Sequence, residues 1–576
     1  MNETLPSSGI TVGYELVARV PDIEGRPARL QEVERIPDSD RLAALDTGGV
    51  IWLTGDDGTR ETPILDLRDA GVGFELVNRE ADLRTVAFHP DFATEGAAGY
   101  GKLYVAYSAE IDSRPEGVRV FPATAREPLF DDVVAEFTVA DPADPVVDPA
   151  TKRELYRVEQ SVSNHNVGSL NFDPELSPGD PGYGLLFASH GDGGNDDLLR
   201  GAQDPGHPYG SFLRYDPLEG GDGAPYTPAA DNPRLPGWLP EMYAIGFRNP
   251  QMFSFEDGII WTGDVGQDTR EEINLVLAGG NYGWSEREGT LASPPGSGSF
   301  DPSSDGFQYP IAEYDHDTRV GAAGVAVAGG YVYDGEAAPE LDGRYTFSNF
   351  SDGRVFVIYA GADEDPLDDG RVTPDETYVP ETVDLVERNG FETSFQSVVA
   401  NTAGRADLRW GEDADGELLF FGKHTGEILR VVSPGTGSGP GPATEADARG
   451  VALIYEAVLD RDGAIDEAGF DFWLGQVENG FDLPTIAGFF LASDEFAEKF
   501  GAVGTLSTQE LVERTYLNVS GRPGGEEGVD FWTREAETRG LSDAELVLTL
   551  ANGFDPDTLA FLDAVEQGEG GGWMVA

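Results

Sequence analysis

Short runs of apolar or alternating residues recur along the first three quarters of the chain, and turns that contain Gly or Asp separate many of them. Val50–Thr54, Gly101–Tyr107, Ser211–Tyr215 and Gly329–Tyr333 are examples. Runs of this length with β-branched and aromatic residues are typical of strands, because helices need longer segments with a period of about 3.6 residues. The repeated strand-turn-strand pattern therefore predicts an all-β propeller over residues 15–432.

The pattern changes after this region. Residues 433–445 are rich in Gly, Pro and Ser, which is the composition of a flexible linker, and residues 446–565 carry apolar positions at helical spacing. Two related units are visible there, each with a leading Tyr and a closing Phe-Trp pair: Tyr455 with Phe472 and Trp473, then Tyr516 with Phe531 and Trp532. We expect a smaller all-α domain in which these aromatic residues form the core.

Composition and charge narrow the class of protein. The 75 Gly and 38 Pro residues suit a chain with many turns. The 105 acidic residues against 38 basic residues give a net charge of -67, so phosphate backbones and anionic membranes would be repelled. We therefore expect no nucleic-acid partner. The acidity has two readings that stay open, a general bias in composition and a specific role in binding cations.

The location of the protein is predicted from what the sequence lacks. Cysteine is absent, so the fold does not depend on disulfides. Met1 to Tyr14 has no basic region followed by an apolar run, and no window reaches membrane-spanning length. We expect an extracellular or cell-surface protein without a cleavable signal peptide and without a membrane span, and a periplasmic location is the alternative.

His165 and Asp192 are the first candidates for chemistry. His165 lies in a polar turn before a strand-like run, and the next strand ends in Gly191-Asp192-Gly193-Gly194. Adjacent strands can bring an imidazole close to a carboxylate, as a general base and its orienting partner require. The alternatives are a hydrogen-bonded surface histidine and an Asp-Gly turn that closes a hairpin.

The stretch from Ala244 to Trp284 holds the densest group of polar residues. Two strand-like runs lead there into the loop Gly263–Gln267, and Glu271 and Glu272 follow it. Oxygen donors clustered in this way suit calcium. Arg248 precedes these runs, where it could be a structural ion-pair partner or could reach into a site.

Four motifs follow one another in this part of the chain: Gly246-Phe247-Arg248-Asn249-Pro250, Gly263-Asp264-Val265-Gly266-Gln267, Glu271-Glu272-Ile273-Asn274 and Gly279-Gly280-Asn281-Tyr282-Gly283-Trp284. In this order they resemble the glucose/sorbosone dehydrogenase family. The resemblance implies a six-bladed propeller that oxidises sugars with pyrroloquinoline quinone (PQQ) and calcium. The helical region resembles a duplicated bacterial domain of unknown function, found on secreted or surface proteins, which implies a surface or protein partner.

The resemblance also implies roles for single residues. His165 would take the proton from the anomeric hydroxyl of an aldose, Asp192 would orient it, and Arg248 would stabilise charge on a quinone oxygen. Glu80, Arg248 and Asn249 would bind the cofactor. Backbone oxygens of Gly266 and Gln267 would hold one calcium, and Glu272 with the backbone near Tyr282 would hold another. The sequence does not name the sugar or the electron acceptor.

The basic residues that such enzymes offer to the cofactor carboxylates depart from the family pattern. Asn349–Gly353 lacks the Lys, and Gly404–Arg409 lacks a clean Arg-x-Arg sequence. Arg405, Arg409 and Lys423 are the candidates to replace them. The alternative function is a non-catalytic, secreted, calcium-stabilised propeller that binds a glycan or a protein partner.

Overall fold

The computed structural model divides the chain into two compact units, Met1–Thr436 and Gly437–Ala576. The division falls inside the stretch expected to be a linker. The structure describes residues 5–23, 25–55, 58–60, 62–68, 70–74, 82–123, 126–194, 201–218, 220, 223–293, 306–316, 326–359, 367, 371–386, 392–400, 405–434, 445–461, 465, 467–478, 481, 483–501, 505–539, 541–554, 558–559, 562, 565–567 and 573–575.

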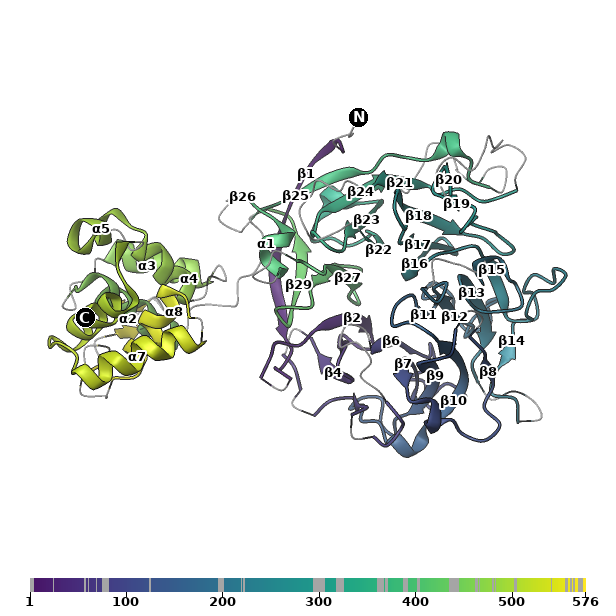
Figure 1. The fold of residues 1–576 in the computed structure, drawn as a ribbon, viewed down its shortest axis with the longest axis horizontal. Helices are drawn as coiled ribbons and strands as arrows, with labels where there is room; N and C mark the ends of the chain where they lie inside the picture. The colour runs from purple at the N-terminus through teal and green to yellow at the C-terminus, as the bar shows by residue number, and fades with distance from the viewer. Residues whose placement is uncertain are drawn as a thin grey trace. The chain divides into compact units, whose positions relative to one another are not determined.

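The first unit is a propeller-like β fold. Its sheets lie around one axis, and one strand of each sheet, or of each half of the largest sheet, faces that axis (Figure 1). These inner strands contact one another in sequence order, and the last contacts the first, so the ring closes. They are β2 (Leu30–Arg35), β6 (Leu83–Phe88), β11 (Val167–Phe172), β16 (Pro250–Glu256), β22 (Val327–Val332) and β27 (Arg409–Glu412).

From each inner strand, further strands run outward in mostly antiparallel order. The sheet of β2 continues with β3 (Leu42–Asp46), β4 (Val50–Thr54) and β5 (Leu65–Asp66). That of β6 continues with β7 (Lys102–Ala109), β9 (Phe130–Thr138), β10 (Arg153–Gln160) and β8 (Val120–Phe121). That of β11 continues with β12 (Leu186–His190) and β13 (Ser211–Asp216), which pairs with β14 (Thr227–Pro228) and β15 (Met242–Ile245). That of β16 continues with β17 (Ile259–Asp264), β18 (Arg270–Val276) and β21 (Ala312–Asp315), while β19 (Arg287–Glu288) and β20 (Leu291–Ala292) form a separate hairpin.

Packing between neighbouring sheets explains why the strands are apolar on both faces. In β7, Leu103 and Val105 join the core shared with the preceding sheet, whereas Tyr104 and Ala106 join the core shared with the following sheet. Side chains alternate across a strand, so a strand held between two sheets needs apolar residues at nearly every position. This is why the sequence shows short continuous apolar runs.

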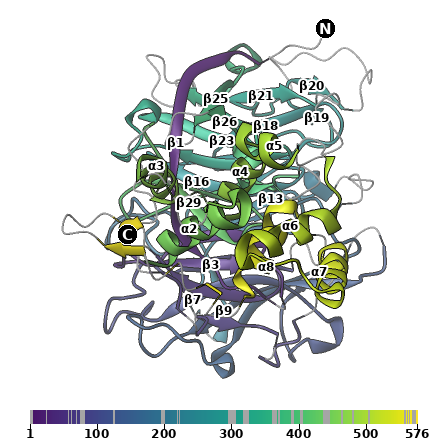
Figure 2. The same cartoon turned by 90° about the vertical axis from the view of Figure 1, so that its left-hand side faces the viewer.

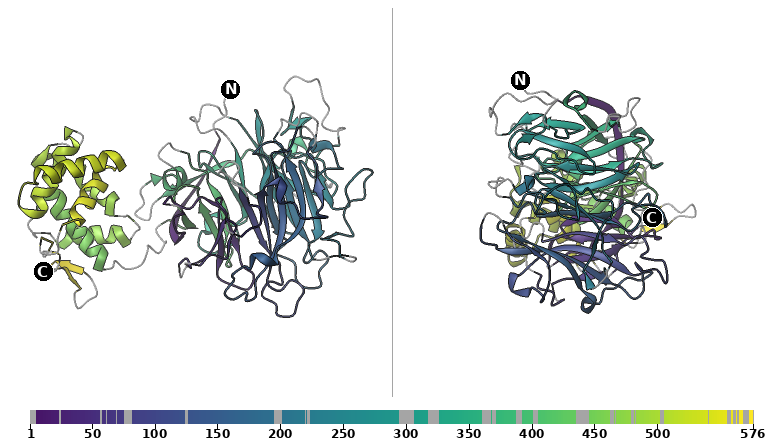
Figure 3. Two further views of the ribbon diagram at one scale, coloured as in Figure 1. Left: turned by 60° about the horizontal axis from the view of Figure 1, so that its bottom comes forward. Right: turned by 90° about the vertical axis from the view of Figure 1, so that its right-hand side faces the viewer.

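The largest sheet has nine strands and closes the ring. One half contains β22, β23 (Arg344–Asn349), β24 (Val355–Tyr359) and β25 (Glu381–Val386), with β26 (Glu392–Thr393) beside β25. The other half contains β27, β28 (Leu418–Phe421) and β29 (Glu427–Val432). The N-terminal strand β1 (Ser7–Arg19) joins them, antiparallel to β29 and parallel to β25. Figures 2 and 3 show β1, in purple, as one long strand against green strands, and it begins before the expected domain start at residue 15.

The second unit is a helical region with a small C-terminal hairpin. The helices are α2 (Glu445–Leu459), α3 (Glu467–Glu478), α4 (Leu483–Leu491), α5 (Asp494–Phe500), α6 (Thr508–Ser520), α7 (Glu526–Arg539) and α8 (Asp543–Asn552). The hairpin pairs β30 (Val565–Gln567) with β31 (Trp573–Val575), and a short helix of the first unit, α1, spans Phe395–Val399. Figure 3 shows these helices gathered in one bundle.

The aromatic residues of the two helical repeats divide between core and surface. Tyr455 is buried, and Trp473, Tyr516 and Trp532 pack against the core. Phe472 and Phe531, which hold the same place in the two repeats, are 56% and 52% exposed. Within the described residues, no helix of either unit is long and apolar enough to cross a membrane.

Candidate active site

A cavity of about 200 Å³ lies where the inner strands begin. Residues at or just before the starts of β2, β11, β16 and β27 line it, among them Gln31, Val167, Gln251 and Arg409. His165 and Asn249 line the same cavity. The structure therefore brings two of the predicted site residues together at one end of the propeller axis.

His165 is held in an uncommon backbone conformation between β10 and β11. Its φ of 56° lies in the left-handed region, which non-glycine residues rarely adopt. The loop after β12 fixes it there, because Gly193 N–H donates to the His165 carbonyl at 3.2 Å. A Cβ added at Gly191 would lie 2.6 Å from the His165 carbonyl carbon, so only glycine allows this close approach.

The imidazole of His165 is bonded to Asp192 as expected. Nδ1 lies 2.6 Å from Asp192 Oδ1, and the histidine side chain is 9% exposed. In the described part of the chain, no group is hydrogen-bonded to Nε2, the nitrogen left for a ligand. Because Asp192 accepts at Nδ1–H, it fixes the tautomer in which Nε2 can take a proton.

Asp192 is itself held by two further donors. Gly194 N–H donates to Oδ1 at 2.8 Å, and Trp284 Nε1–H donates to Oδ2 at 2.8 Å. Burial raises the pKa of the Asp192 carboxyl, but the hydrogen bond and charge of His165, with Gly194 and Arg248, outweigh it and hold the pKa below its usual value. Asp192 is therefore ionised at neutral pH and supports a positive charge on the imidazole.

Arg248 is joined to this pair through the backbone. Its carbonyl accepts from Asp192 N–H at 2.8 Å, and its own N–H donates to Asp264 Oδ2 at 2.9 Å. The guanidinium donates to the carbonyls of Val265 at 2.8 Å and Gly266 at 2.7 Å, and lies 5.6 Å from the Trp284 ring. In this structure the guanidinium therefore lies against the loop 265–266, and Arg248 is not among the residues that line the cavity of His165.

Basic side chains surround the cavity, although the chain as a whole is strongly acidic. Arg405, Arg409 and Lys423 lie 5.5, 4.9 and 5.5 Å from the Phe350 ring, and all four residues line the cavity. Arg29 and Arg84 line it as well, and Asp407 is the one carboxylate among the described lining residues. The cavity is thus suited to an anion with several negative groups.

Arg409 has the most constrained position of these cations. It is 5% exposed, and one terminal nitrogen donates to Gln251 Oε1 at 3.0 Å. Burial lowers the pKa of its guanidinium to about 10, against the opposing charges of Asp407 and Glu32. Its Nε is buried without a hydrogen-bond partner among the described residues. A buried donor without a partner is costly, so a carboxylate in the cavity would stabilise it.

The loop predicted to hold calcium surrounds the carboxylate of Glu288 in this structure. Glu288 Oε1 accepts backbone N–H groups from Gln267, Asp268, Thr269 and Arg270 at 2.7 to 3.2 Å. A Cβ at Gly266 would lie 1.6 Å from the Arg270 carbonyl, so the turn requires glycine. Gln267 Oε1 is buried without a hydrogen-bond partner among the described residues, so this loop holds one oxygen donor that is not used.

Glu272 lies near a second buried carboxylate. It is directly opposite Asp264 on the neighbouring strand, and its oxygens accept from Gly289 N–H and from Asn274 Nδ2. Burial, then the charge of Asp264, raises the pKa of Glu272 well above its usual value, and burial raises that of Asp264 to about 7. The Tyr282 hydroxyl bonds elsewhere, to the backbone of Leu275 and Leu277.

The described residues contain no group of three or more His, Asp or Glu side chains spaced to hold a metal ion. Glu80, predicted to bind the cofactor, lies outside the described residues. The sequence predicted no site role for Trp284 and Asp264, although both lie inside the motifs given above. It predicted none for Phe350 either, and the candidate cations Arg405, Arg409 and Lys423 were the only features of the sequence that pointed to its surroundings.

The chain is similar to known proteins over the part that contains these motifs. Residues 29–377 match the family described as Glucose / Sorbosone dehydrogenase. The HIPL1 protein of Arabidopsis thaliana is 27% identical over 356 residues, which cover 54% of this chain and 47% of HIPL1. Quinoprotein glucose dehydrogenase B of Acinetobacter calcoaceticus is 42% identical over 55 residues, 9% of this chain and 12% of that protein. The chain spans about half the length of HIPL1 and of the related HIPL2 protein.

Two solved structures have a similar arrangement of strands. The PQQ-bound form of aldose sugar dehydrogenase from Streptomyces coelicolor is 19% identical with a TM-score of 0.47, covering 74% of this chain and 99% of that chain. The apo-form of the soluble aldose sugar dehydrogenase from Escherichia coli is 20% identical with a TM-score of 0.46, covering 73% and 99%.

Proposed function

The chain belongs to the glucose/sorbosone dehydrogenase family, and on that premise we propose that it oxidises an aldose sugar at the anomeric carbon with PQQ as its cofactor. The proposal extends to the architecture. The ring of six inner strands and the division of the nine-stranded sheet into two halves support a six-bladed propeller, in which β1 completes the sixth blade.

The basic cavity around His165 is the observation that carries the proposal. A protein with a net charge of -67 places Arg29, Arg84, Arg405, Arg409 and Lys423 around one cavity. PQQ carries three carboxylates, and the buried Nε of Arg409 has no partner among the described residues. Arg405, Arg409 and Lys423 would hold the cofactor by charge, and Phe350, at their centre, would offer a ring face to the planar quinone.

The residues around His165 are suited to proton transfer. PQQ bound in this cavity would supply the acceptor for the hydride of the anomeric carbon. His165 Nε2 takes the proton of the anomeric hydroxyl, while Asp192 and Trp284 keep the ring in one orientation and the ionised Asp192 stabilises the imidazolium. Asn249 lines the same cavity and offers an amide to the cofactor or the sugar.

Calcium would be held by the loop of Gly266 and Gln267. Gln267 Oε1, which is buried without a hydrogen-bond partner among the described residues, supports this because it is a hard oxygen donor in the same loop. The Arg248 guanidinium donates to that carbonyl in this structure, so calcium at the same oxygen requires Arg248 to move. A displaced guanidinium would be free to reach a quinone oxygen, which is the role proposed for it.

A second candidate function is a calcium-stabilised propeller that binds a glycan or a protein partner without catalysis. The position of Arg248, outside the residues that line the cavity of His165, favours it. The two candidates differ in one measurable property, since only the dehydrogenase needs the quinone.

The experiment is a titration of the full chain with PQQ in the presence of calcium, followed by addition of aldoses and an electron-accepting dye. We expect stoichiometric binding, seen in the absorbance of the cofactor, and dye reduction that depends on the sugar. Absence of PQQ binding by the folded, calcium-loaded protein would refute the dehydrogenase and leave the binding module.

The cationic cavity itself is tested by Arg409→Gln. We expect at least tenfold weaker PQQ binding, since the substitution removes a buried charge from the carboxylate site. Arg126→Gln, which removes the same charge from an exposed position, is the matched control and should leave binding unchanged. Equal affinities for the two variants would show that the cavity does not recognise the carboxylates.

A further inference from the structure

A second cavity lies at the opposite end of the inner strands. Residues near the ends of β2, β11, β16, β22 and β27 line it, and its volume is about 380 Å³. A small void of about 20 Å³, lined by residues from the middle of the strands, lies between it and the cavity of His165. The inner strands thus run from the basic cavity of His165 at one end to a cavity lined by different ionisable side chains at the other end.

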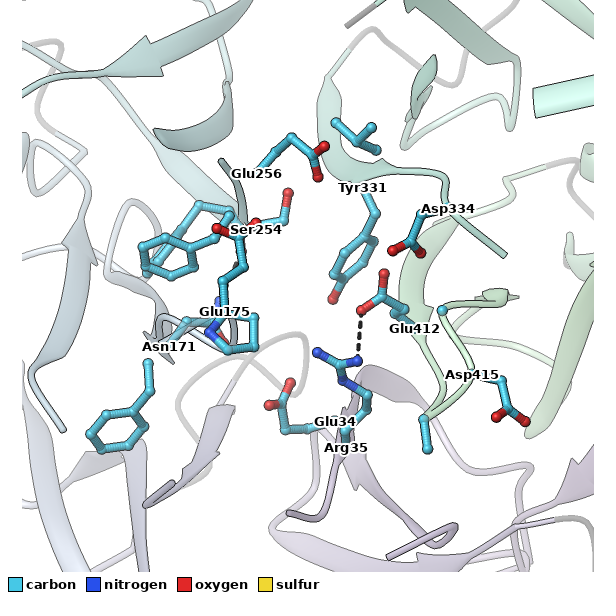
Figure 4. Close-up of a pocket in the computed structure, with 17 residues that line it drawn as sticks. Glu34, Arg35, Asn171, Glu175, Ser254, Glu256, Tyr331, Asp334, Glu412 and Asp415 are labelled. Carbon is cyan, nitrogen blue, oxygen red and sulfur yellow. Dashed lines mark hydrogen bonds and ion pairs between the residues drawn. The ribbon is translucent and has the colours of Figure 1, made fainter. Parts of the chain in front are cut away.

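Carboxyl side chains make up most of the ionisable lining of this second cavity (Figure 4). Arg35 is its one cation among the described lining residues, and it pairs with Glu412 at 3.1 Å. The carboxylates that line it come from separate elements and surround the space: Glu34, Glu175, Glu256, Asp334, Glu412 and Asp415. Glu175 accepts the backbone N–H groups of Asp257 and Gly258, and no hydrogen bond is found for the carboxylates of Glu34 and Glu256 in the described structure.

Two uncharged polar groups in the wall also lack partners. Ser254 is 5% exposed, and its Oγ has no hydrogen-bond partner among the described residues. The half-buried Tyr331 also lacks a hydrogen-bond partner for its hydroxyl among the described residues, and Figure 4 shows it on the opposite side of the cavity from Ser254. A buried polar group without a partner is costly, so Ser254 Oγ in this wall points to a ligand that supplies a hydrogen bond.

We propose that this acidic cavity binds a linear polyamine, a ligand with several ammonium groups spaced along an alkyl chain. A single metal ion does not fit, because within the described residues no three acidic or histidine side chains are close enough to hold one. Separated ammonium groups can each approach one carboxylate, while Ser254 Oγ and the Tyr331 oxygen accept from the same donors. The ring of Phe255, which is half-buried in the lining, suits an alkyl segment between them.

The ionisation of the carboxyl groups in this cavity predicts a second measurable effect of polyamine binding, a release of protons. Burial raises the pKa of Glu34 to about 8 and those of Glu256 and Glu412 to about 7, with the charges of Glu175, Asp334 and Glu412 adding to the rise and Arg35 opposing it. Alkylammonium groups stay charged up to about pH 9. Binding should therefore release protons near pH 7 and strengthen as pH rises from 6 to 8.5, when Tyr331 remains neutral.

The test is calorimetric titration of the full chain with spermidine at pH 8 in 0.15 M NaCl, where the field of distant surface charges is screened. We expect one saturable site per chain. Glu34→Gln combined with Glu256→Gln should weaken binding at least tenfold. Glu116→Gln combined with Glu127→Gln removes two charges from exposed positions and should change affinity less than twofold.

Titration of the unmodified protein in two buffers of different ionisation enthalpy measures the proton release, and does not depend on whether the variants fold. Three results would overturn the proposal: no saturable binding, an equal loss of affinity in both double variants, or displacement of spermidine by Mg²⁺ or Ca²⁺ at equal concentration. The site is separate from His165, so spermidine binding and PQQ-dependent dye reduction can fail independently.

Discussion

At the scale of single residues, the hydrogen bond from Trp284 to Asp192 links two distant parts of the chain. Trp284 lies in the loop between β18 and β19, Asp192 follows β12, and both contact Arg248. The indole N–H thus fixes one carboxylate oxygen while His165 occupies the other. We therefore expect Trp284 to affect the proposed sugar oxidation through the position of Asp192.

Replacement of Trp284 by Phe should lower the rate of sugar oxidation about tenfold, the effect of about 1.4 kcal/mol in the barrier. Without the indole donor, Asp192 attracts the imidazole proton more strongly, so the acid limb of the rate–pH profile should move to higher pH. PQQ affinity should stay unchanged. Trp52→Phe is the control, because Trp52 Nε1 has no hydrogen-bond partner to lose in the described structure. An unshifted pH profile for Trp284→Phe would contradict the positioning role.

Replacement of His165 by Gln should abolish sugar-dependent dye reduction, because the amide has no basic nitrogen. The melting temperature should fall little, since Gln can still donate to Asp192, and PQQ should still bind. Rate, melting temperature and cofactor absorbance measured on one preparation separate these effects. Turnover equal to that of the unmodified enzyme would exclude His165 as the base.

The residue scale also shows how far a sequence can predict a site. The pairing of His165 with Asp192 could be predicted, because both flank strands whose apolar patterns place them side by side. The direction of the Arg248 side chain could not, since the carbonyls of Val265 and Gly266 hold it and their orientation depends on how the loop folds. Arg405, Arg409 and Lys423 were named as candidates from the sequence, but their position around Phe350 could not be predicted, because the fold brings them together with it from separate segments.

At the scale of elements, strand positions followed the sequence closely where apolar runs are continuous, and β4 coincides with the expected Val50–Thr54. Strand ends were less predictable. The run Gly329–Tyr333 indicated a strand, whereas β22 spans Val327–Val332, because its pairing with β23 starts at Val327 and Asn349. Strand β1 carries no local sign of its partners, since β25 and β29 lie far along the chain.

Val12, at the centre of β1, gives a test of this closure. It is fully buried, pairs with Leu385 of β25 and belongs to the core of the last sheet. Val12→Ala should destabilise the propeller by about 2 kcal/mol, measured by denaturant unfolding, through lost burial and a residual cavity. Val146→Ala, at a position 47% exposed, should change stability by less than about 0.5 kcal/mol. Equal effects would mean that β1 is not an integral strand.

At the scale of the whole molecule, buried carboxyls make stability depend on pH. Burial raises the pKa values of Asp264, Glu256 and Glu412 to about 7 and that of Glu34 to about 8. Their protonated forms favour the folded state. The resulting stabilisation is complete below the ordinary carboxyl pKa of about 4 and is lost as pH rises through 7 to 8.

The melting temperature of the first unit should therefore fall between pH 6 and pH 9 at constant salt. The melting temperature of the variant with Glu34→Gln and Glu256→Gln should fall less over the same pH range, because Gln stays neutral. Calorimetry across this range, with Glu116→Gln combined with Glu127→Gln as control, checks the prediction. A steeper fall in the cavity variant than in the control would contradict the assignment of these groups.

The place of β1 between β25 and β29 has a consequence for synthesis of the protein. Strand β1 is synthesised long before β29, which ends at Val432 and is one of the two strands to which β1 bonds. Until β29 has been synthesised, the ring stays open and β1 lacks its hydrogen-bonded neighbours. The earlier sheets can form while the chain is still growing, but the two cavities at the ends of the inner strands take shape only when the ring closes. We therefore expect the chain to gain ligand binding late in its synthesis and in one step, when the ring closes.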